Sequence, residues 1–372
     1  MPDDTLMTKK KSVPFILLQF ASCIFVTFLL STFILLNLIP AAPQLLLDAN
    51  KFSNECPAYG CIFSPKENQT VTLSSSTQFP TTSCQLGCLF TRQGPSHAVN
   101  QDRSFLIRPF LTQQQAKSTH KDESFLVAIL DGHGVLGHEV AEFARTELPR
   151  IVADKLNARQ CCQSDDWIQQ QLKDAFAELQ KYVPVHSGQR GGCTASVTLR
   201  IGEKLYFANA GDSRTILVHG KLNATVVYHT RFDKPHLPDE RARIEGRGGK
   251  IHTPPQNSAM SRVIVFSKVA NETIGLAMSR SVGDLEWKKI GVTAEPIVDV
   301  VPIESIDRQF LVAASDGLWD LRRMEFLARR FTNDLYEPGR DTTFAEKLPL
   351  FVDRIAPRKG YRDDISVVVV PL

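Results

Sequence analysis

Residues 125–134 read Phe125-Leu126-Val127-Ala128-Ile129-Leu130-Asp131-Gly132-His133-Gly134. The six apolar residues predict a buried strand, and a strand that ends at Asp131 fixes the position of that carboxylate. The glycines let the backbone approach a ligand closely, and His133 can serve as an acid or a base near neutral pH. This arrangement is typical of a metal site, although Asp-Gly is also a common turn sequence.

The same combination of an apolar run and an aspartate occurs twice downstream. Residues 310–315 lead into Asp316-Gly317, and Asp363-Asp364 stands directly before the mostly apolar residues 365–370. Further aspartates in similar contexts, beside a predicted strand and in most cases beside a glycine, are Asp102, Asp212 and Asp320. Any one of them alone would indicate a turn, but the set predicts a shared site.

Oxygen ligands without a cluster of Cys or His favour Mg²⁺ or Mn²⁺ over Zn²⁺. Two such ions, about 3.5–4 Å apart, can share one carboxylate and one bridging water, which then loses a proton and becomes a nucleophile. The ions also neutralise the anionic oxygens of a phosphate ester. The aspartates therefore predict a two-metal site that hydrolyses phosphate esters.

The composition is that of an ordinary globular protein. The chain has 372 residues, of which 43% are hydrophobic and 22% charged, enough for one large domain or two small ones. The formal net charge of +3 is close to neutral for this length, and the charges form no basic stripe. We therefore expect no nucleic-acid partner.

The N-terminal region predicts a single-pass membrane anchor. Residues 12–47 contain no Asp, Glu, Lys or Arg, and the apolar residues 15–39 exceed the roughly 20 needed to cross a bilayer. A cleaved signal peptide has a shorter apolar centre of roughly 7–15 residues, although cleavage near Pro40 is the alternative. We expect a cytosolic N-terminus over residues 1–12 and a transmembrane helix over 13–39.

The side of the membrane that carries the rest of the chain is left open by the sequence. Three lysines before the span, Lys9, Lys10 and Lys11, favour a cytosolic N-terminus and a large domain outside or in a lumen. Residues 40–90 are interpreted as a linker, because residues 64–83 are polar and lack periodicity. Its four cysteines fit disulfides in a lumen, a zinc site, or free thiols in the cytosol: Cys56, Cys61, Cys84 and Cys88.

Residues 91–372 predict a layered α+β domain. Residues 193–201 and 204–209 flank Gly202-Glu203 and predict a hairpin. Apolar residues at helical spacing predict one helix around residues 140–148 and another around 168–179. Two successive helices followed by several antiparallel strands favour sheets that are covered by helices.

Several ordered motifs from about Gln93 to the C-terminus resemble those of one family, the metal-dependent type 2C (PPM-type) Ser/Thr protein phosphatases. The motifs are Val99-Asn100-Gln101-Asp102, Asp131-Gly132-His133-Gly134, Gly192-Cys193-Thr194-Ala195, Ala208-Asn209-Ala210-Gly211-Asp212-Ser213-Arg214, Leu276-Ala277-Met278-Ser279-Arg280-Ser281-Val282-Gly283-Asp284, Ala314-Ser315-Asp316-Gly317-Leu318-Trp319-Asp320 and Asp363-Asp364-Ile365-Ser366. Lys234-Pro235 and the residues after it resemble the family's connecting segment. The resemblance implies a four-layer αββα fold, an antiparallel β-sandwich flanked by helices, with the metals at one end. It also implies hydrolysis of phosphoserine and phosphothreonine in protein substrates.

The resemblance also implies which residues hold the Mg²⁺ or Mn²⁺ ions. Asp131 would bridge both ions, and the Gly132 carbonyl would bind the first. Asp316 and Asp363 would complete the second. A weaker third ion would lie near Asp316, held also by Asp212 and Asp320.

Five further residues receive roles from the same resemblance. His133 would protonate the leaving seryl or threonyl oxygen, and Asp102 would orient waters on the metals. Gln101 and Thr194 would support the metal ligands without binding the ions themselves, although for Thr194 a packing role fits equally well. His97 stands where the family usually has an Arg, sometimes a Lys, that grips the substrate phosphate. An imidazole cannot form the two parallel bonds of a guanidinium.

The two departures from the family pattern leave alternatives open. Arg92 or Arg103 could reach the phosphate in place of His97, and Gln101 stands where many members carry Glu. A phosphatase-fold binding module with weak or no activity is the alternative that the His97 substitution favours. A hydrolase of small phosphate esters is the third.

Overall fold

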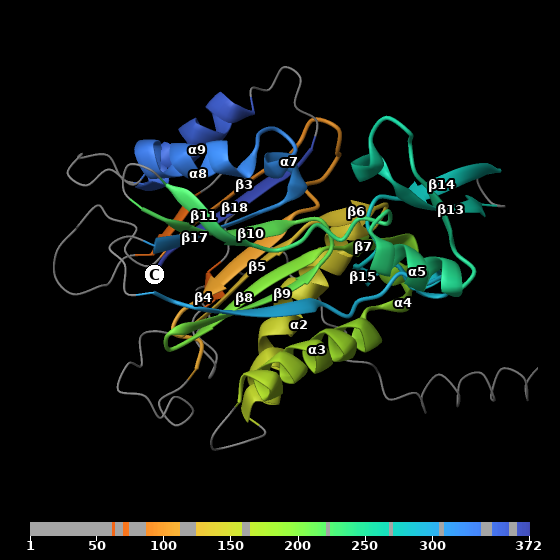
Figure 1. Ribbon diagram of the computed structural model, residues 1–372, viewed down its shortest axis with the longest axis horizontal. Helices are drawn as coiled ribbons and strands as arrows, with labels where there is room; N and C mark the ends of the chain where they lie inside the picture. Colours follow the sequence, from red (N-terminus) through yellow and green to blue (C-terminus); the bar gives the residue numbers. More distant parts are fainter. Residues whose placement is uncertain are drawn as a thin grey trace, which may run out of the picture. The chain divides into compact units, whose positions relative to one another are not determined.

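Two six-stranded antiparallel sheets form the centre of the described fold (Figure 1). The first sheet has the order β1 (Ile62–Phe63), β4 (Arg103–Ile107), β5 (Phe125–Leu130), β8 (Ala195–Ile201), β9 (Lys204–Ala210), β16 (Ile297–Pro302). The second has the order β11 (Thr225–His229), β10 (Arg214–His219), β17 (Gln309–Ala314), β18 (Ile365–Pro371), β3 (Gly87–Arg92), β2 (Thr70–Leu73). The predicted hairpin is confirmed as β8 and β9, which begins at Ala195 because Cys193 belongs to a separate short strand.

Alternation along the strands builds the sandwich. In β5, Phe125, Val127 and Ile129 point into the apolar layer shared with the second sheet, where they join Leu311 and Val368. The intervening residues of β5 point to the opposite face and pack against the first pair of helices. This period of two explains why an uninterrupted apolar run is a strand here: both of its faces are buried.

Helices cover the outer face of each sheet, so that the layers run helix, sheet, sheet, helix (Figure 1). The first sheet is covered by α2 (Gly137–Asn157) and α3 (Asp165–Tyr182), which confirm the two predicted helices. The second is covered by α8 (Met324–Arg330) and α9 (Phe344–Ile355). The prediction of two antiparallel sheets flanked by helices is therefore confirmed.

Helix α3 shows how the sequence sets the ends and faces of such a helix. It begins after Ser164, whose side chain accepts a hydrogen bond from the Trp167 N–H at 3.3 Å. Acidic residues occupy its first turn and Lys181 its last, which matches the helix dipole. Its buried face is apolar and follows the helical period.

Smaller elements complete the described fold. A three-stranded sheet contains β12 (Lys250–His252), β13 (Arg262–Ser267) and β14 (Glu272–Leu276), next to α5 (Pro238–Gly246). A second has the order β15 (Val282–Gly283), β7 (Gly191–Cys193), β6 (Gly132–Gly134). Short helical turns are α4 (Val185–Arg190), α6 (Leu285–Lys288), α7 (Asp316–Trp319), the 3-10 turn Ser258–Met260 and the π turn Phe331–Leu335.

The computed structural model describes residues 62–63, 70–73, 87–111, 124–157, 164–220, 224–267, 271–304, 309–335, 344–356 and 363–372. Within these ranges, no helix is long and apolar enough to span a membrane. The predicted N-terminus 1–12 and transmembrane helix 13–39 lie outside them. They also fall in a separate unit, Met1–Ser53, while all described residues belong to Asn54–Leu372.

The interpretation of residues 40–90 as a linker is wrong for the parts that form strands. β2 pairs with β3, and β1 pairs with β4, so the sandwich takes strands from before residue 91. Cys88 in β3 is buried and disulfide-bonded, which matches the disulfide interpretation for this cysteine. Cys193 is free and buried, and Cys56, Cys61 and Cys84 lie outside the described residues.

Candidate active site

Three of the predicted site aspartates lie at one end of the first sheet. Asp102 lies directly before β4, and Asp131 lies directly after β5. Asp212 is separated from the end of β9 by one residue. The register explains their proximity: β4 begins opposite the end of β5, and β8 begins opposite the end of β9. Because β5 and β8 are also paired, these strand ends share one edge of the sheet.

The second sheet brings the remaining aspartates to a corresponding end. β17 ends opposite the beginning of β18, so that Asp316, just after β17, and Asp363, just before β18, are close in the fold. Ser315 links this end to the first sheet, since its hydroxyl donates to Oδ2 of Asp102 at 2.8 Å. The two sheets therefore each contribute one half of the site.

Burial and mutual repulsion dominate the electrostatics of this cluster. Burial raises the pKa of Asp131 well above its ordinary value, and the nearby Asp102, Asp316, Asp363 and Asp212 raise it further. The pKa of Asp316 is also well above its ordinary value, from burial and from Asp212 and Asp363. Burial and Asp364 raise the pKa of Asp102 to about 7. The pKa values of Asp320 and Asp363 are raised as well, with burial as the largest cause.

The carboxylate oxygens of this cluster suit divalent cations as ligands. Oδ1 of Asp102 and Oδ1 of Asp212 are buried without a hydrogen-bond partner among the described residues. Buried oxygens that repel one another and lack donors are costly unless a cation compensates them. Hard oxygen ligands of this kind suit Mg²⁺ or Mn²⁺.

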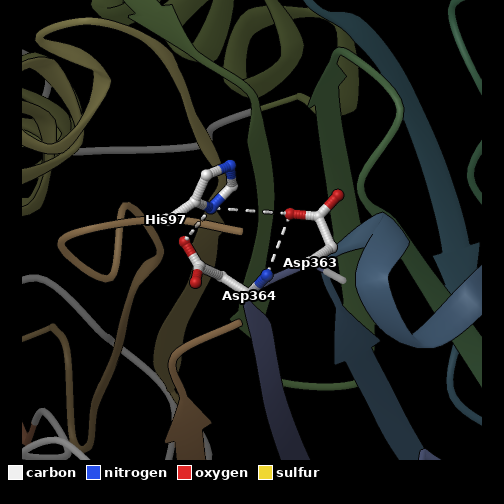
Figure 2. Close-up of side chains that lie close together, drawn as sticks. All are labelled: His97, Asp363 and Asp364. Carbon is white, nitrogen blue, oxygen red and sulfur yellow. Dashed lines mark hydrogen bonds and ion pairs between the residues drawn. The ribbon is translucent and has the colours of Figure 1, made fainter. Parts of the chain in front are cut away.

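Only one trio of side chains in the described ranges places one ligand atom each within 4.8 Å of the others: His97, Asp363 and Asp364 (Figure 2). Nδ1 of His97 lies 2.9 Å from Oδ2 of Asp364 and 3.9 Å from Oδ1 of Asp363. Of the predicted metal ligands, Asp363 alone belongs to this trio. No three of the other predicted aspartate ligands in the described ranges meet this distance, although Asp316, Asp363 and Asp212 are near enough to raise the pKa of Asp131.

Asp364 has a role that was not predicted from the sequence. It is 2% exposed and accepts hydrogen bonds from the backbone N–H groups of Gly94 at 2.6 Å and Gln101 at 2.7 Å, besides its bond with His97. It therefore fastens the loop between β3 and β4, which carries His97 and Asp102, to the beginning of β18. The sequence signal for this role is the pair Asp363-Asp364, because only Asp363 was expected to bind a metal and Asp364 was left without a predicted role.

The two supporting residues contact backbone around the site. Thr194 is fully buried, its hydroxyl accepts the Asp131 N–H at 3.1 Å, and its own N–H donates to the Asp131 carbonyl at 2.8 Å. That hydroxyl also lies 2.7 Å from the Ser213 hydroxyl. Gln101 donates from Nε2 to the Gly134 carbonyl at 2.9 Å. Both residues thus hold the segment that contains Asp131 and Gly132.

A lysine also enters the site. Nζ of Lys234 lies 2.6 Å from Oδ2 of Asp212, which is 1% exposed. Burial lowers the pKa of Lys234, but Asp212, Asp316 and Asp320 outweigh it and hold the pKa above its ordinary value. From the sequence, Lys234 was expected only to belong to a connecting segment.

His133 has a carboxylate partner in the residue directly after β15. Its Nε2 lies 2.7 Å from Oδ2 of Asp284, which is 4% exposed. Burial lowers the pKa of His133, but the charge of Asp284 and its hydrogen bond raise it above the ordinary value overall. Asp284 ends the motif that begins at Leu276, but no pattern in the sequence pairs it with His133.

The two arginines considered as substitutes for the missing phosphate-binding arginine are both engaged elsewhere. Arg92 is buried, pairs with Asp353 and donates to the Ala356 carbonyl at 2.8 Å. Arg103 donates from Nε to Glu142 at 2.7 Å and from Nη1 to the Asp102 carbonyl at 2.8 Å. Arg92 is only 4% exposed, whereas the side chain of Arg103 remains 26% exposed, so His97 and Arg103 are the remaining candidates.

Comparison with known proteins identifies the family. The family model for Protein phosphatase 2C matches residues 94–343. The Arabidopsis thaliana protein named "Probable protein phosphatase 2C 61" is 30% identical over 280 residues, which cover 74% of this chain and 81% of that protein. Another from the same plant, "Probable protein phosphatase 2C 73", is 31% identical over 306 residues and covers 76% and 78% respectively.

Solved structures show the same fold. The crystal structure of a serine-threonine phosphatase 2C from Toxoplasma gondii superposes with a TM-score of 0.60 at 18% identity, covering 82% of this chain and 99% of that one. At this identity the superposition shows only that the fold is shared. Membership of the family is shown by the matched family model and the plant relatives. The chain therefore belongs to the protein phosphatase 2C (PPM) family.

Proposed function

We propose that this protein is a metal-dependent phosphatase that hydrolyses phosphoserine and phosphothreonine in other proteins. Its family membership supports the reaction class. The single observation that carries the proposal is the group of aspartates that two sheets bring to one place: their charges raise one another's pKa, and one carboxylate oxygen each of the buried Asp102 and Asp212 has no hydrogen-bond partner among the described residues. A fold without metal would gain nothing from keeping these charges together.

The residues would divide the work as follows. Asp131, the Gly132 carbonyl, Asp316 and Asp363 would hold two Mg²⁺ or Mn²⁺ ions, and Asp212 and Asp320 would contribute to a weaker third site. The bound ions supply a Lewis acid that activates water and neutralises phosphate oxygens.

The remaining site residues act on protons and on the substrate. Asp102 would accept hydrogen bonds from waters at the site, and His133 would give a proton to the leaving oxygen. Gln101 and Thr194 would keep Asp131 and Gly132 in place through the backbone contacts described above. His97 would face the substrate phosphate, held by Asp364.

The test is a phosphate-release assay on the full-length protein in detergent, with a phosphothreonine peptide. We expect turnover with Mn²⁺ or Mg²⁺, none with chelator, and a loss of at least ~10²-fold in Asp131→Asn and in Asp316→Asn, since metal-ion catalysis supplies several kcal/mol. Asp299→Asn is the matched control, because Asp299 lies on β16 and bonds to Tyr228 away from the site. Near-normal turnover in Asp131→Asn would contradict the proposal.

A binding module without activity is the second candidate. The observation in its favour is that His97, which takes the place of a phosphate-gripping arginine, is tied to Asp364 at 2.9 Å. That assay together with a binding measurement on the same phosphopeptide separates the two functions: metal-dependent binding without phosphate release would support the module.

We also propose that residues 13–39 anchor the protein in a membrane as a single span. The uncharged stretch 12–47 supports this proposal. The disulfide at Cys88 favours a domain on the oxidising side, because disulfides persist mainly in secretory compartments. Alkaline extraction of membranes tests the anchor, and protease treatment of intact vesicles tests the side. Digestion of the domain by protease that is added only on the cytosolic face would contradict a lumenal domain.

A further inference from the structure

His133 and Asp284 meet across a strand that has no side chain between them. The small sheet has the order β15, β7, β6, with β7 in the middle. Gly192 of β7 pairs with His133 of β6 on one side and with Gly283 of β15 on the other. Asp284, directly after Gly283, therefore comes within 2.7 Å of the His133 ring although 151 positions separate the two in sequence.

Glycine at position 192 is required for this contact. A Cβ placed there would lie 2.5 Å from Oδ2 of Asp284 and 2.8 Å from Nε2 of His133. These atoms are the two that make the hydrogen bond, so any larger residue would separate the pair. The chain thus provides a gap of one side chain, and the hydrogen bond occupies it.

Asp284 is itself held firmly. The Ser281 hydroxyl donates to Oδ2 of Asp284 at 2.6 Å, and Nζ of Lys288 donates to the Ser281 hydroxyl at 3.1 Å. The Asp284 N–H donates to the Gly191 carbonyl at 3.0 Å. The residue adopts a left-handed conformation with φ of 51°, which Asp and Asn tolerate better than most residues. These contacts fix the carboxylate in one orientation.

We propose that Asp284 is a positioning residue that fixes the His133 ring, so that Nδ1 delivers the proton to the leaving oxygen of the substrate. The inference rests on the proposed function. Nδ1 of His133 is buried and has no hydrogen-bond partner among the residues that the structure describes, while Nε2 is committed to Asp284. A carboxylate on one ring nitrogen selects which nitrogen carries the transferable proton.

In the proposed step, a proton from His133 neutralises the leaving oxygen of the substrate. Water attacks phosphorus, the bond between phosphorus and the seryl or threonyl oxygen breaks, and that oxygen takes the proton from Nδ1. His133 is left neutral with its Nε2–H still donated to Asp284. The products are an alcohol and inorganic phosphate, and His133 regains a proton from solvent before the next cycle.

The experiment compares two substrates of the full-length protein with Mn²⁺. A phosphothreonine peptide releases an alkoxide that needs a proton, whereas p-nitrophenyl phosphate releases a stable anion that does not. General acid catalysis is worth roughly 10²–10⁴-fold, so we expect Asp284→Asn to lower kcat for the peptide by ~10-fold or more. For p-nitrophenyl phosphate we expect a change of less than about 3-fold, because the same principle gives the acid little to do.

Three further variants separate positioning from general damage. Asp299→Asn, the matched control, should change neither kcat. Gly192→Ala should reproduce the peptide-selective loss, because its methyl group displaces the pair while both partners remain. Adding Asp284→Asn to His133→Gln should slow the peptide reaction no further, because two residues that act through one step are not additive.

The outcomes are distinct. An equal loss on both substrates, or an additive loss in the double variant, overturns the positioning role while leaving the proposed function intact. Unchanged peptide turnover in both Asp284→Asn and Gly192→Ala also overturns it. Absence of metal-dependent turnover of either substrate by the unmodified protein overturns the proposed function, and this inference with it. Calorimetric Mn²⁺ binding should be the same in Asp284→Asn as in the unmodified protein, since Asp284 is not a predicted metal ligand.

Discussion

The ammonium of Lys234 lies 2.6 Å from a carboxylate oxygen of Asp212, inside the cluster of aspartates at the end of the sandwich. Asp316 and Asp320 also act on this ammonium through their charges. These three aspartates are the ones predicted to hold a weak third ion. Lys234 would therefore compete with the proposed third ion for Asp212.

We expect Lys234→Met to tighten binding of the weakest Mn²⁺ ion by ~10-fold, since a hydrogen bond to a charged group is worth about 1.5–3 kcal/mol. Without metal, the same variant should be destabilised, because Asp212 is left buried without its partner. Calorimetry and thermal unfolding with and without Mn²⁺ measure both effects. Lys204→Met, which removes an exposed pair with Asp165, is the control. An unchanged Mn²⁺ titration in Lys234→Met would rule out the competition.

The stability of the metal-free protein should fall as pH rises from about 4 to about 7. In the unfolded chain Asp102 loses its proton near the ordinary pKa of 3.8, while burial holds its pKa in the folded protein at about 7. Between these values the unfolded state releases a proton that the folded state keeps, so each pH unit favours unfolding by ~1.4 kcal/mol for such a group. Thermal unfolding in chelator at several pH values measures the slope.

Two comparisons test this cause. Asp102→Asn should make the slope less steep, because the amide does not titrate, while the raised pKa values of Asp131 and Asp316 keep part of it. Mn²⁺ should raise the melting temperature more at pH 7 than at pH 5, since ionised carboxylates bind it better. Stability in chelator that rises toward pH 7 would show that the aspartates are not held together as described.

Thr194→Val should weaken both the fold and metal binding. It removes the hydroxyl that accepts the Asp131 N–H, and leaving that donor without a partner costs about 1–3 kcal/mol. Thr198→Val is a close control, since Thr198 is equally buried on β8 but its hydroxyl has no partner among the described residues. Chemical denaturation and Mn²⁺ calorimetry should separate the two variants. Equal behaviour would reduce Thr194 to a packing role.

His97→Arg should lower KM for a phosphothreonine peptide by ~10-fold, because a guanidinium can form two charge-assisted bonds with phosphate. Asp364 would remain beside the new side chain to orient it. His97→Ala should raise KM only modestly, and the comparison is made by steady-state kinetics at one pH. If Arg raises KM as much as Ala does, position 97 does not contact the substrate phosphate.

The sequence predicts those parts of the site that depend on local pattern. Asp131, Asp316 and Asp363 each adjoin an apolar strand, and both the strand and the carboxylate at its end can be read from neighbouring residues. The alternation in β5 that buries both faces follows from the same run of six apolar residues. For β5, the strand and the position of the aspartate at its end were therefore predictable from residues 125–134 alone.

The parts that could not be predicted depend on contacts between distant residues. The hydrogen bond between His133 and Asp284 requires a residue without a side chain at position 192. The only trace of this contact in the sequence is therefore a glycine. Lys234 reaches Asp212 from a segment 22 positions away, and no periodicity links them. The linker prediction failed for β2 because four residues of a short edge strand, residues 70–73, carry too little pattern to distinguish them from a polar segment.

The division of the site between the two sheets has a practical consequence. Asp131 follows a strand of one sheet and Asp316 follows a strand of the other, so a chain in which either sheet has lost its register would bring together only half of the proposed metal ligands. Phosphate release would then report the correct closure of the whole sandwich, and variants of unknown folding quality could be ranked by turnover before any spectrum is recorded.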